Sequence, residues 1–68
     1  MPFINIKLLG GPDAPTKEQK AELIKRTTQM MVEVLNKDPE GTVVVIEEVS
    51  ADNWGRCGIS TTERRAKK

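Results

Sequence analysis

The stretch Thr42-Val43-Val44-Val45-Ile46 decides the fold. All of its side chains are β-branched, and apolar residues fall on both faces of a strand built from it. Strands of this composition occur where a sheet is covered on both sides. The stretch therefore predicts an interior strand.

A second strand is predicted near the start of the chain, where residues 2–9 alternate. Ile4, Ile6 and Leu8 point to one side. The other side carries Phe3, Asn5, Lys7 and Leu9. The glycines and prolines of Gly10-Gly11-Pro12-Asp13-Ala14-Pro15 then indicate a loop.

A helix is predicted between the two strands. Thr16-Lys17-Glu18-Gln19 has the pattern of a capping box, which begins a helix, and Asp38-Pro39 is expected to end it, because proline disfavours helical backbone in the preceding residue. Apolar and small residues spaced by three and four predict one stripe facing the core: Ala21, Ile24, Thr27, Thr28, Met31, Val34 and Leu35. Two pairs in the favourable order are expected on the wetter side: Glu22 with Arg26, and Glu33 with Lys37.

A strand, a helix and a second strand form a βαβ unit of the α/β class (α+β in some schemes), with parallel strands and a right-handed crossover. After the second strand, Gly55 and Gly58 follow Asp52-Asn53 and predict a tight turn or short hairpin that carries the only tryptophan, Trp54. The polar and basic residues 61–68 are expected to be a frayed terminus, or alternatively to line a neighbour's cleft. Residues 1–68 are predicted to form a single domain.

The length of 68 residues predicts self-association. A domain of this size buries only about 60% of its unfolded surface and is marginally stable alone. One cysteine cannot form an internal disulfide, and without histidine no structural zinc site is expected. Two strands and one helix also leave sheet edges unpaired, so we expect sheets to join between subunits in a closed, symmetric assembly.

Several classes of partner are disfavoured by composition. The net charge is +1, with acidic and basic residues interspersed, so nucleic-acid binding is not expected. No apolar run approaches the roughly 20 residues of a membrane span, and no signal-peptide pattern is present. We expect a cytoplasmic protein with a reduced Cys57.

Candidate catalytic groups are few, because the chain contains no histidine and no tyrosine. If Met1 is removed, Pro2 becomes a free secondary amine, and α-amino groups titrate at roughly 7.7 to 8.0 in peptides. A base in this range is effective near neutral pH. With Met1 attached the nitrogen is an amide, and a proline at the first residue of a strand is also ordinary.

These features together are similar to the 4-oxalocrotonate tautomerase family along nearly the whole chain. The resemblance rests on Pro2 directly after Met1, the strand Pro-Phe-Ile-Asn-Ile-Lys-Leu, Thr-Lys-Glu-Gln-Lys opening the helix, the Val-rich second strand and Asp-Asn-Trp-Gly-x-x-Gly. It implies a β-α-β protomer, dimers that share a four-stranded sheet, and commonly a hexamer. It also implies that Pro2 is a general base and that Trp54 is the active-site aromatic, with no metal or organic cofactor.

Two arginines of that family have no counterpart in this chain. The arginine expected after the first strand is missing from Gly10-Gly11-Pro12, and Val44 stands where the second strand usually carries the other. Arg56 and Lys7 are the candidates for binding a substrate carboxylate in their place, although both could be solvated surface charges. Cys57 is a weaker candidate, because the sequence pairs no base or cation with its thiol.

The sequence thus predicts an isomerase, a tautomerase that moves a proton between enol and keto forms of a small unsaturated 2-hydroxy or 2-oxo acid. Pro2 is the predicted base, and Trp54, Arg56 and Lys7 are the predicted substrate-binding residues. The alternative is a non-catalytic homo-oligomer of the same fold. A third possibility uses the amine of Pro2 as a covalent nucleophile or to direct water onto an unsaturated acid.

Overall fold

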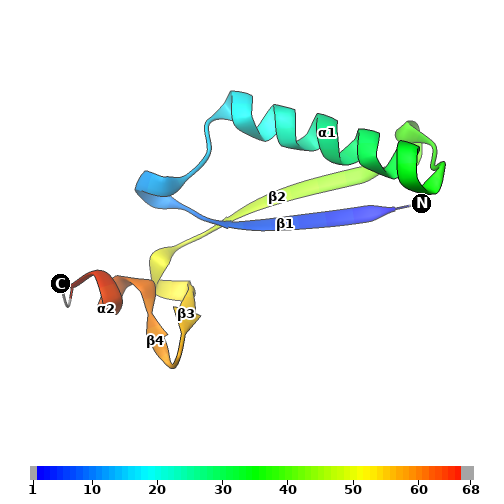
Figure 1. Ribbon diagram of the computed structural model, residues 1–68. Helices are drawn as coiled ribbons and strands as arrows, with labels where there is room; N and C mark the ends of the chain where they lie inside the picture. Colours follow the sequence, from blue (N-terminus) through cyan, green and yellow to red (C-terminus); the bar gives the residue numbers. More distant parts are fainter. Residues whose placement is uncertain (1, 67–68) are drawn as a thin grey trace.

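The computed structural model describes residues 2–66 and has a β-α-β arrangement followed by a short antiparallel hairpin and a terminal helix (Figure 1). This confirms the predicted fold class. The elements in chain order are β1 (Phe3–Leu9), the 3-10 turn η1 (Gly11–Asp13), α1 (Lys17–Leu35), η2 (Pro39–Gly41), β2 (Val43–Val49), η3 (Ala51–Asn53), β3 (Gly55–Arg56), β4 (Ile59–Ser60) and α2 (Thr61–Ala66).

β1 and β2 pair in parallel, as predicted, in a register that runs from Phe3 opposite Val43 to Leu9 opposite Val49. Side chains at paired positions of a parallel ladder point to the same face. The register therefore divides the sheet into two faces. The covered face carries Ile4, Ile6, Leu8, Val44, Ile46 and Glu48. The open face carries Phe3, Asn5, Lys7, Leu9, Val43, Val45, Glu47 and Val49.

α1 begins with the predicted capping box. The Gln19 N–H donates to the Thr16 hydroxyl over 3.1 Å, and the Thr16 N–H donates to the Gln19 side-chain oxygen over 2.9 Å. The helix ends at Leu35, earlier than expected, because Asn36 adopts left-handed backbone (φ 55°) and its N–H bonds back to helix carbonyls. Lys37 therefore lies beyond the helix, and the ion pairs found among residues 2–66 do not include the predicted one with Glu33.

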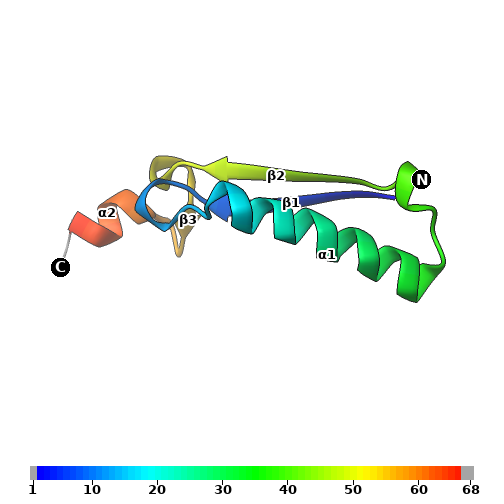
Figure 2. The ribbon, with the colours of Figure 1, turned by 90° about the horizontal axis from the view of Figure 1, so that it is seen from above.

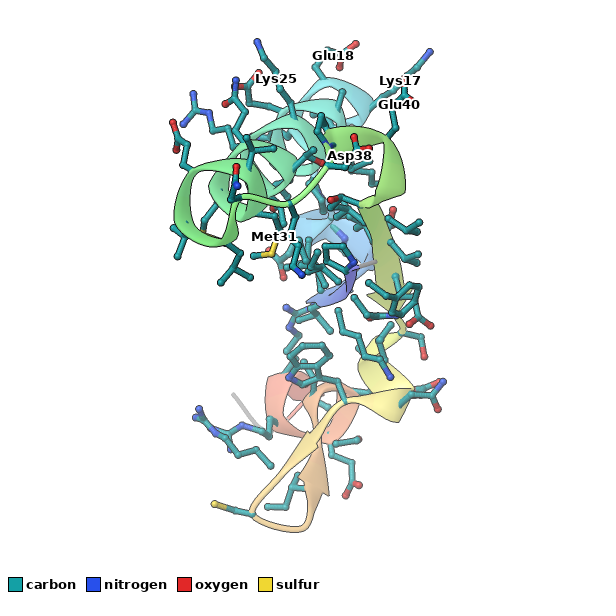
Figure 3. All side chains as sticks on the ribbon, turned by 90° about the vertical axis from the view of Figure 1, so that its right-hand side faces the viewer. Lys17, Glu18, Lys25, Met31, Asp38 and Glu40 are labelled. Atoms are coloured by element: carbon teal, nitrogen blue, oxygen red, sulfur yellow. The ribbon has the colours of Figure 1, made fainter. Side chains whose placement is uncertain are left out.

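α1 lies on one side of the strands, with Met31 on its inner side (Figure 3). Lys20 ties the first half of the helix to the sheet by an ion pair with Glu48 on the covered face. The half-buried helix positions include Thr27, Thr28 and Met31, as predicted. Ala21, Ile24, Val34 and Leu35 were also expected on this stripe, but all four are exposed, Val34 by 72%, since the helix meets a sheet of only two strands.

The C-terminal segment corrects the prediction of a frayed terminus. Residues 61–66 form α2, whose first residue donates from both its N–H and its hydroxyl to the carbonyl of Trp54, over 2.8 Å and 2.9 Å. Thr62 donates to Asp52, and Arg65 forms an ion pair with Asp13 in η1. Polar contacts therefore hold α2 against η1 and η3, the turns that follow β1 and β2 at one end of the sheet. The remaining basic residues, 67–68, lie outside the described part of the chain.

The protomer is elongated and open (Figure 2), with principal extents of 47 × 25 × 15 Å. Its radius of gyration is 15.4 Å, against about 11 Å for a compact chain of this length. Its accessible surface is 5324 Å², against about 4,300 Å² for a compact monomer of this mass. Among residues 2–66 no apolar side chain is fully buried. The large exposed surface of one chain is what we expect of a protomer that associates with further copies.

Candidate active site

Pro2 lies at the N-terminal end of β1, at the same end of the molecule as η2 and the last turn of α1 (Figure 1). It is half-buried, and its carbonyl accepts a hydrogen bond of 3.0 Å from the N–H of Val43. The first bond of the parallel ladder thus fixes the backbone of Pro2. Removal of Met1 remains a prediction, because Met1 lies outside the described residues.

Trp54 lies at the other end of the sheet, after η3, with 38% of its surface exposed. Its carbonyl is held by Thr61, so the start of α2 fixes the backbone beside the indole. β2 runs the whole length between the two ends, and at about 3.3 Å per residue that length is roughly 20 Å. One chain therefore does not bring Trp54 to Pro2.

Arg56 lies two residues after Trp54 in the first strand of the predicted hairpin. β3 and β4 pair antiparallel with Arg56 opposite Ile59. Cys57 and Gly58 between them both have positive φ, 56° and 77°, the backbone of a type I′ turn. The guanidinium of Arg56 is exposed, and the ion pairs found within residues 2–66 do not include it.

Lys7 lies on the open face, where it faces Glu47 in the register of the two strands. The Glu47 carboxylate accepts a hydrogen bond of 2.6 Å from the side-chain amide of Asn5. A carboxylate ligand at Lys7 would therefore meet a neighbouring negative charge. The polar cluster of Asn5, Lys7 and Glu47 was not predicted, although Glu47 and Asn5 both fall on the face defined by alternation.

The loop after β1 has no cation of its own. Gly10 is buried, its N–H donates to Val49 over 2.8 Å, and a Cβ there would sit 3.4 Å from the Cβ of Glu48. Gly11 has φ 77°, which favours glycine. The basic side chain brought to this loop is Arg65, through its ion pair with Asp13. Sequence reasoning missed this contact, since only the fold joins positions so distant along the chain.

The amino-acid sequence matches a known family model, described as "Tautomerase enzyme", over residues 2–64. The chain is 52% identical over 65 residues to "Probable tautomerase K2" of Dickeya dadantii, covering 96% of this chain and 94% of that protein. It is 35% identical over 63 residues to the 2-hydroxymuconate tautomerase of Pseudomonas putida, covering 93% and 95%.

Solved structures agree with these relatives. The chain is similar to DmpI from Helicobacter pylori with a TM-score of 0.84 and 46% identity, over 98% of this chain and 100% of that one. It is also similar to a heterohexamer 4-oxalocrotonate tautomerase from Chloroflexus aurantiacus, with a TM-score of 0.79 and 27% identity over 93% and 97%. The chain belongs to the tautomerase family, within its 4-oxalocrotonate tautomerase group, and is an isomerase.

Two further properties concern the part of the chain that the structure describes. None of its helices has the length and apolar character to cross a membrane. None of its His, Cys, Asp and Glu side chains gather in a group of three or more that could hold a metal ion.

Proposed function

We propose that this tautomerase interconverts the enol and keto forms of a small unsaturated 2-hydroxy or 2-oxo acid, with the ring nitrogen of Pro2 as the base after removal of Met1. One observation carries the proposal: the family match begins at Pro2, which stands half-buried at the start of β1. The composition supports it, because histidine and tyrosine are absent.

The proposed reaction is a proton transfer in which the atoms of the substrate are conserved. The nitrogen of Pro2 takes the hydroxyl proton of the enol while the C–O bond becomes a carbonyl and the carbon–carbon double bond shifts. The protonated amine then returns the proton to carbon, which restores the base. No oxidant or cofactor enters this balance. Proton transfer by a positioned base contributes typically about 10²–10⁴-fold to a rate.

Trp54, Arg56 and Lys7 are the proposed substrate-binding residues. The indole of Trp54 supplies an apolar wall, and the guanidinium of Arg56 suits a carboxylate because it can donate two parallel hydrogen bonds. Since Trp54 lies at the opposite end of the sheet from Pro2, the residues that meet at one site come from different copies. We therefore propose a homohexamer; the Chloroflexus protein is a heterohexamer, which supports an assembly of six subunits.

The decay of a phenyl-substituted enol of a 2-oxo acid, followed by absorbance, tests the role of Pro2. One variant carries an extra glutamine between Met1 and Pro2, which keeps the initiator methionine and leaves the ring nitrogen as an amide. We expect its catalysed rate to fall by about 10²-fold or more. Pro2→Ala retains an amine and a small second residue, so it should keep part of the activity.

Mass spectrometry and circular dichroism provide the controls for this experiment. The native protein should lack Met1, and both variants should match its helical signal and assembly mass. Equal rates for all three proteins, or an intact Met1 on active native protein, would remove Pro2 from the mechanism. We also propose a cytoplasmic location, which suits the exposed free thiol of Cys57; recovery of the protein outside the cytoplasm on cell fractionation would contradict this.

A further inference from the structure

α2 connects Trp54 with the loop after β1, and both lie at the same end of the protomer (Figure 1, Figure 2). Thr61, the first residue of α2, donates from its N–H and its hydroxyl to the Trp54 carbonyl, over 2.8 Å and 2.9 Å. Arg65, four residues later, forms an ion pair with Asp13 in η1. Positions four apart lie on the same side of a helix. One side of α2 therefore carries the contacts to both segments.

The loop after β1 leaves open space next to this ion pair. Asp13 is the only charged residue among residues 10–15, so the loop has no cation of its own. Gly11 carries no side chain, and a Cβ there would meet no atom within 4 Å. A small acid that reached this loop would therefore find space beside Asp13 and meet the guanidinium of Arg65.

The other cations of this region are placed less favourably for a ligand carboxylate. Lys7 faces Glu47 in the strand register, so a second carboxylate there meets a negative charge. Lys20 is tied to β2 by an ion pair on the covered face. Arg64 precedes Arg65 in α2 and points about 100° away around the helix axis. Arg65 is the one of these four that the fold brings to the open side of the loop.

The guanidinium of Arg65 keeps donors for a second carboxylate. Its ion pair uses the Nη2 nitrogen, and a guanidinium has five N–H donors in a fixed fork. The side chains of Arg65 and Asp13 are 46% and 58% exposed, so a ligand can reach them. An ion pair this exposed is weak, but it orders a long side chain, and a donor that is already ordered binds at a lower entropic cost.

We propose that Arg65 binds the carboxylate of the substrate beside Trp54 and gives the enzyme its preference for an acid over the corresponding neutral ester. The guanidinium donates two parallel hydrogen bonds to the substrate carboxylate, and Asp13 is a positioning residue that orients it. This inference rests on the proposed function, in which the Trp54 end of one copy meets Pro2 of another. It adds to Arg56 a second cation, one that the fold holds in place.

Binding of a 2-oxo acid that cannot react tests the role of Arg65. Phenylglyoxylate has no hydrogen on the carbon next to its keto group, so it cannot enolise, and its methyl ester is the neutral counterpart with the same chromophore. Trp54 is the only tryptophan and tyrosine is absent, so intrinsic fluorescence follows binding at this end of the sheet. Wild-type protein should bind the acid more tightly than the ester.

Arg65→Gln should weaken binding of the acid by about tenfold and leave the affinity for the ester unchanged, because a charge-assisted, two-bonded contact is lost. Arg64→Gln makes the same change of charge one residue away and should leave both affinities unchanged. An unchanged dissociation constant of the acid in Arg65→Gln, equal weakening of acid and ester, or an equal effect of Arg64→Gln would overturn the proposal.

Arg65→Lys covers the case in which Arg65→Gln does not fold, because lysine can keep the ion pair with Asp13. Lysine lacks the planar fork of arginine, so the acid should bind about threefold more weakly or worse, again with no change for the ester. Wild-type affinity of this variant for the acid would contradict binding by the guanidinium fork. Circular dichroism and native mass spectrometry check that each variant folds and assembles.

These binding measurements separate the role of Arg65 from the role of Pro2. With the reactive enol, Arg65→Gln should mainly raise KM, whereas blocking the nitrogen of Pro2 should mainly lower kcat. Pro2-dependent catalysis with no effect of Arg65→Gln on acid binding would refute this inference alone. Loss of acid binding in Arg65→Gln, with rates that do not depend on Pro2, would refute the proposed base and keep Arg65 as the carboxylate-binding residue.

Discussion

The two faces of the β1–β2 sheet are similar in composition but differ in cover. The covered face carries Ile4, Ile6 and Leu8 half-buried on the side of α1, whereas on the open face Phe3 is 66% and Val43 38% exposed. An isolated sheet that meets water on one side normally alternates apolar and polar residues. Five of the eight side chains on the open face are apolar, which indicates that this face is buried in the assembled protein, and the single helix of one chain cannot provide that cover.

Placing a charge on the open face should have the largest effect. Val45→Asp puts a carboxylate beside Val43 and Glu47, opposite Asn5, on a face that we expect other copies to cover, and an unpaired buried charge is strongly unfavourable. We predict loss of assembly in ultracentrifugation. We also predict loss of the helical circular dichroism signal, because within one chain no apolar side chain of residues 2–66 is fully buried. Gln29→Asp is the charge-matched control. Wild-type assembly of Val45→Asp would show that the open face is not an interface.

Truncation on the covered face should have a smaller effect. Ile6 lies opposite Ile46 beneath α1, and Ile6→Ala should lower the free energy of unfolding by about 2 kcal/mol, with about 1 kcal/mol for Ile6→Val. Urea unfolding measures both, at one protein concentration, because assembly makes stability concentration-dependent. A larger loss from Ile6→Ala than from Val45→Asp would reverse the proposed importance of the two faces.

The hairpin end lies beyond both faces, and its polar contacts should matter less. Asp13→Asn removes the ion pair with Arg65, whose partners are 46% and 58% exposed, so we expect a loss of at most about 1 kcal/mol. Trp54 is the only tryptophan and tyrosine is absent, so intrinsic fluorescence reports on this end. Glu63→Gln makes the same change of charge on α2. No spectral difference between the two variants would show that the ion pair does not order the hairpin.

The smallest expected effect concerns Glu22 on the outer side of α1. Arg26 donates a hydrogen bond to this carboxylate and lies close to it, and both effects hold the pKa of Glu22 below its ordinary value of 4.5. A lowered pKa means that the pair stabilises the folded state above pH 4.5 and loses this contribution as the pH falls through the folded pKa. Glu22→Gln should therefore melt slightly below wild type at pH 7, with the difference vanishing in acid. A difference that grows in acid would contradict this sign.

Local patterns predicted the elements well and their ends less well. The alternation of apolar and polar side chains identified β1. The capping box of Thr16 and Gln19 identified the start of α1, because its hydrogen bonds join residues that are close together in the sequence. The end of α1 was missed, since Asn36 competed with Asp38-Pro39 as a stop signal and tolerates left-handed backbone. α2 was missed because its contacts with Trp54, Asp52 and Asp13 exist only once the chain has folded.

The candidate site was predictable by residue type but not by placement. The absence of histidine and tyrosine pointed to Pro2, and the resemblance to the 4-oxalocrotonate tautomerase family pointed to Trp54. The sequence could not show that these residues lie at opposite ends of one protomer, nor that Glu47 stands beside Lys7. Those relations depend on strand direction and register, which join residues that are distant in the chain.

The amino-acid sequence alone determined the β-α-β arrangement, the parallel pairing and the need for further copies of the chain. The spacing of apolar residues can be read from each segment by itself, and the chain length limits how much surface one chain can bury. Only the tertiary structure decided which apolar surfaces stay open and that Arg65 binds Asp13. The physical reason is that exposure and complementarity are set by packing between elements, and one sequence position cannot encode the distance to another.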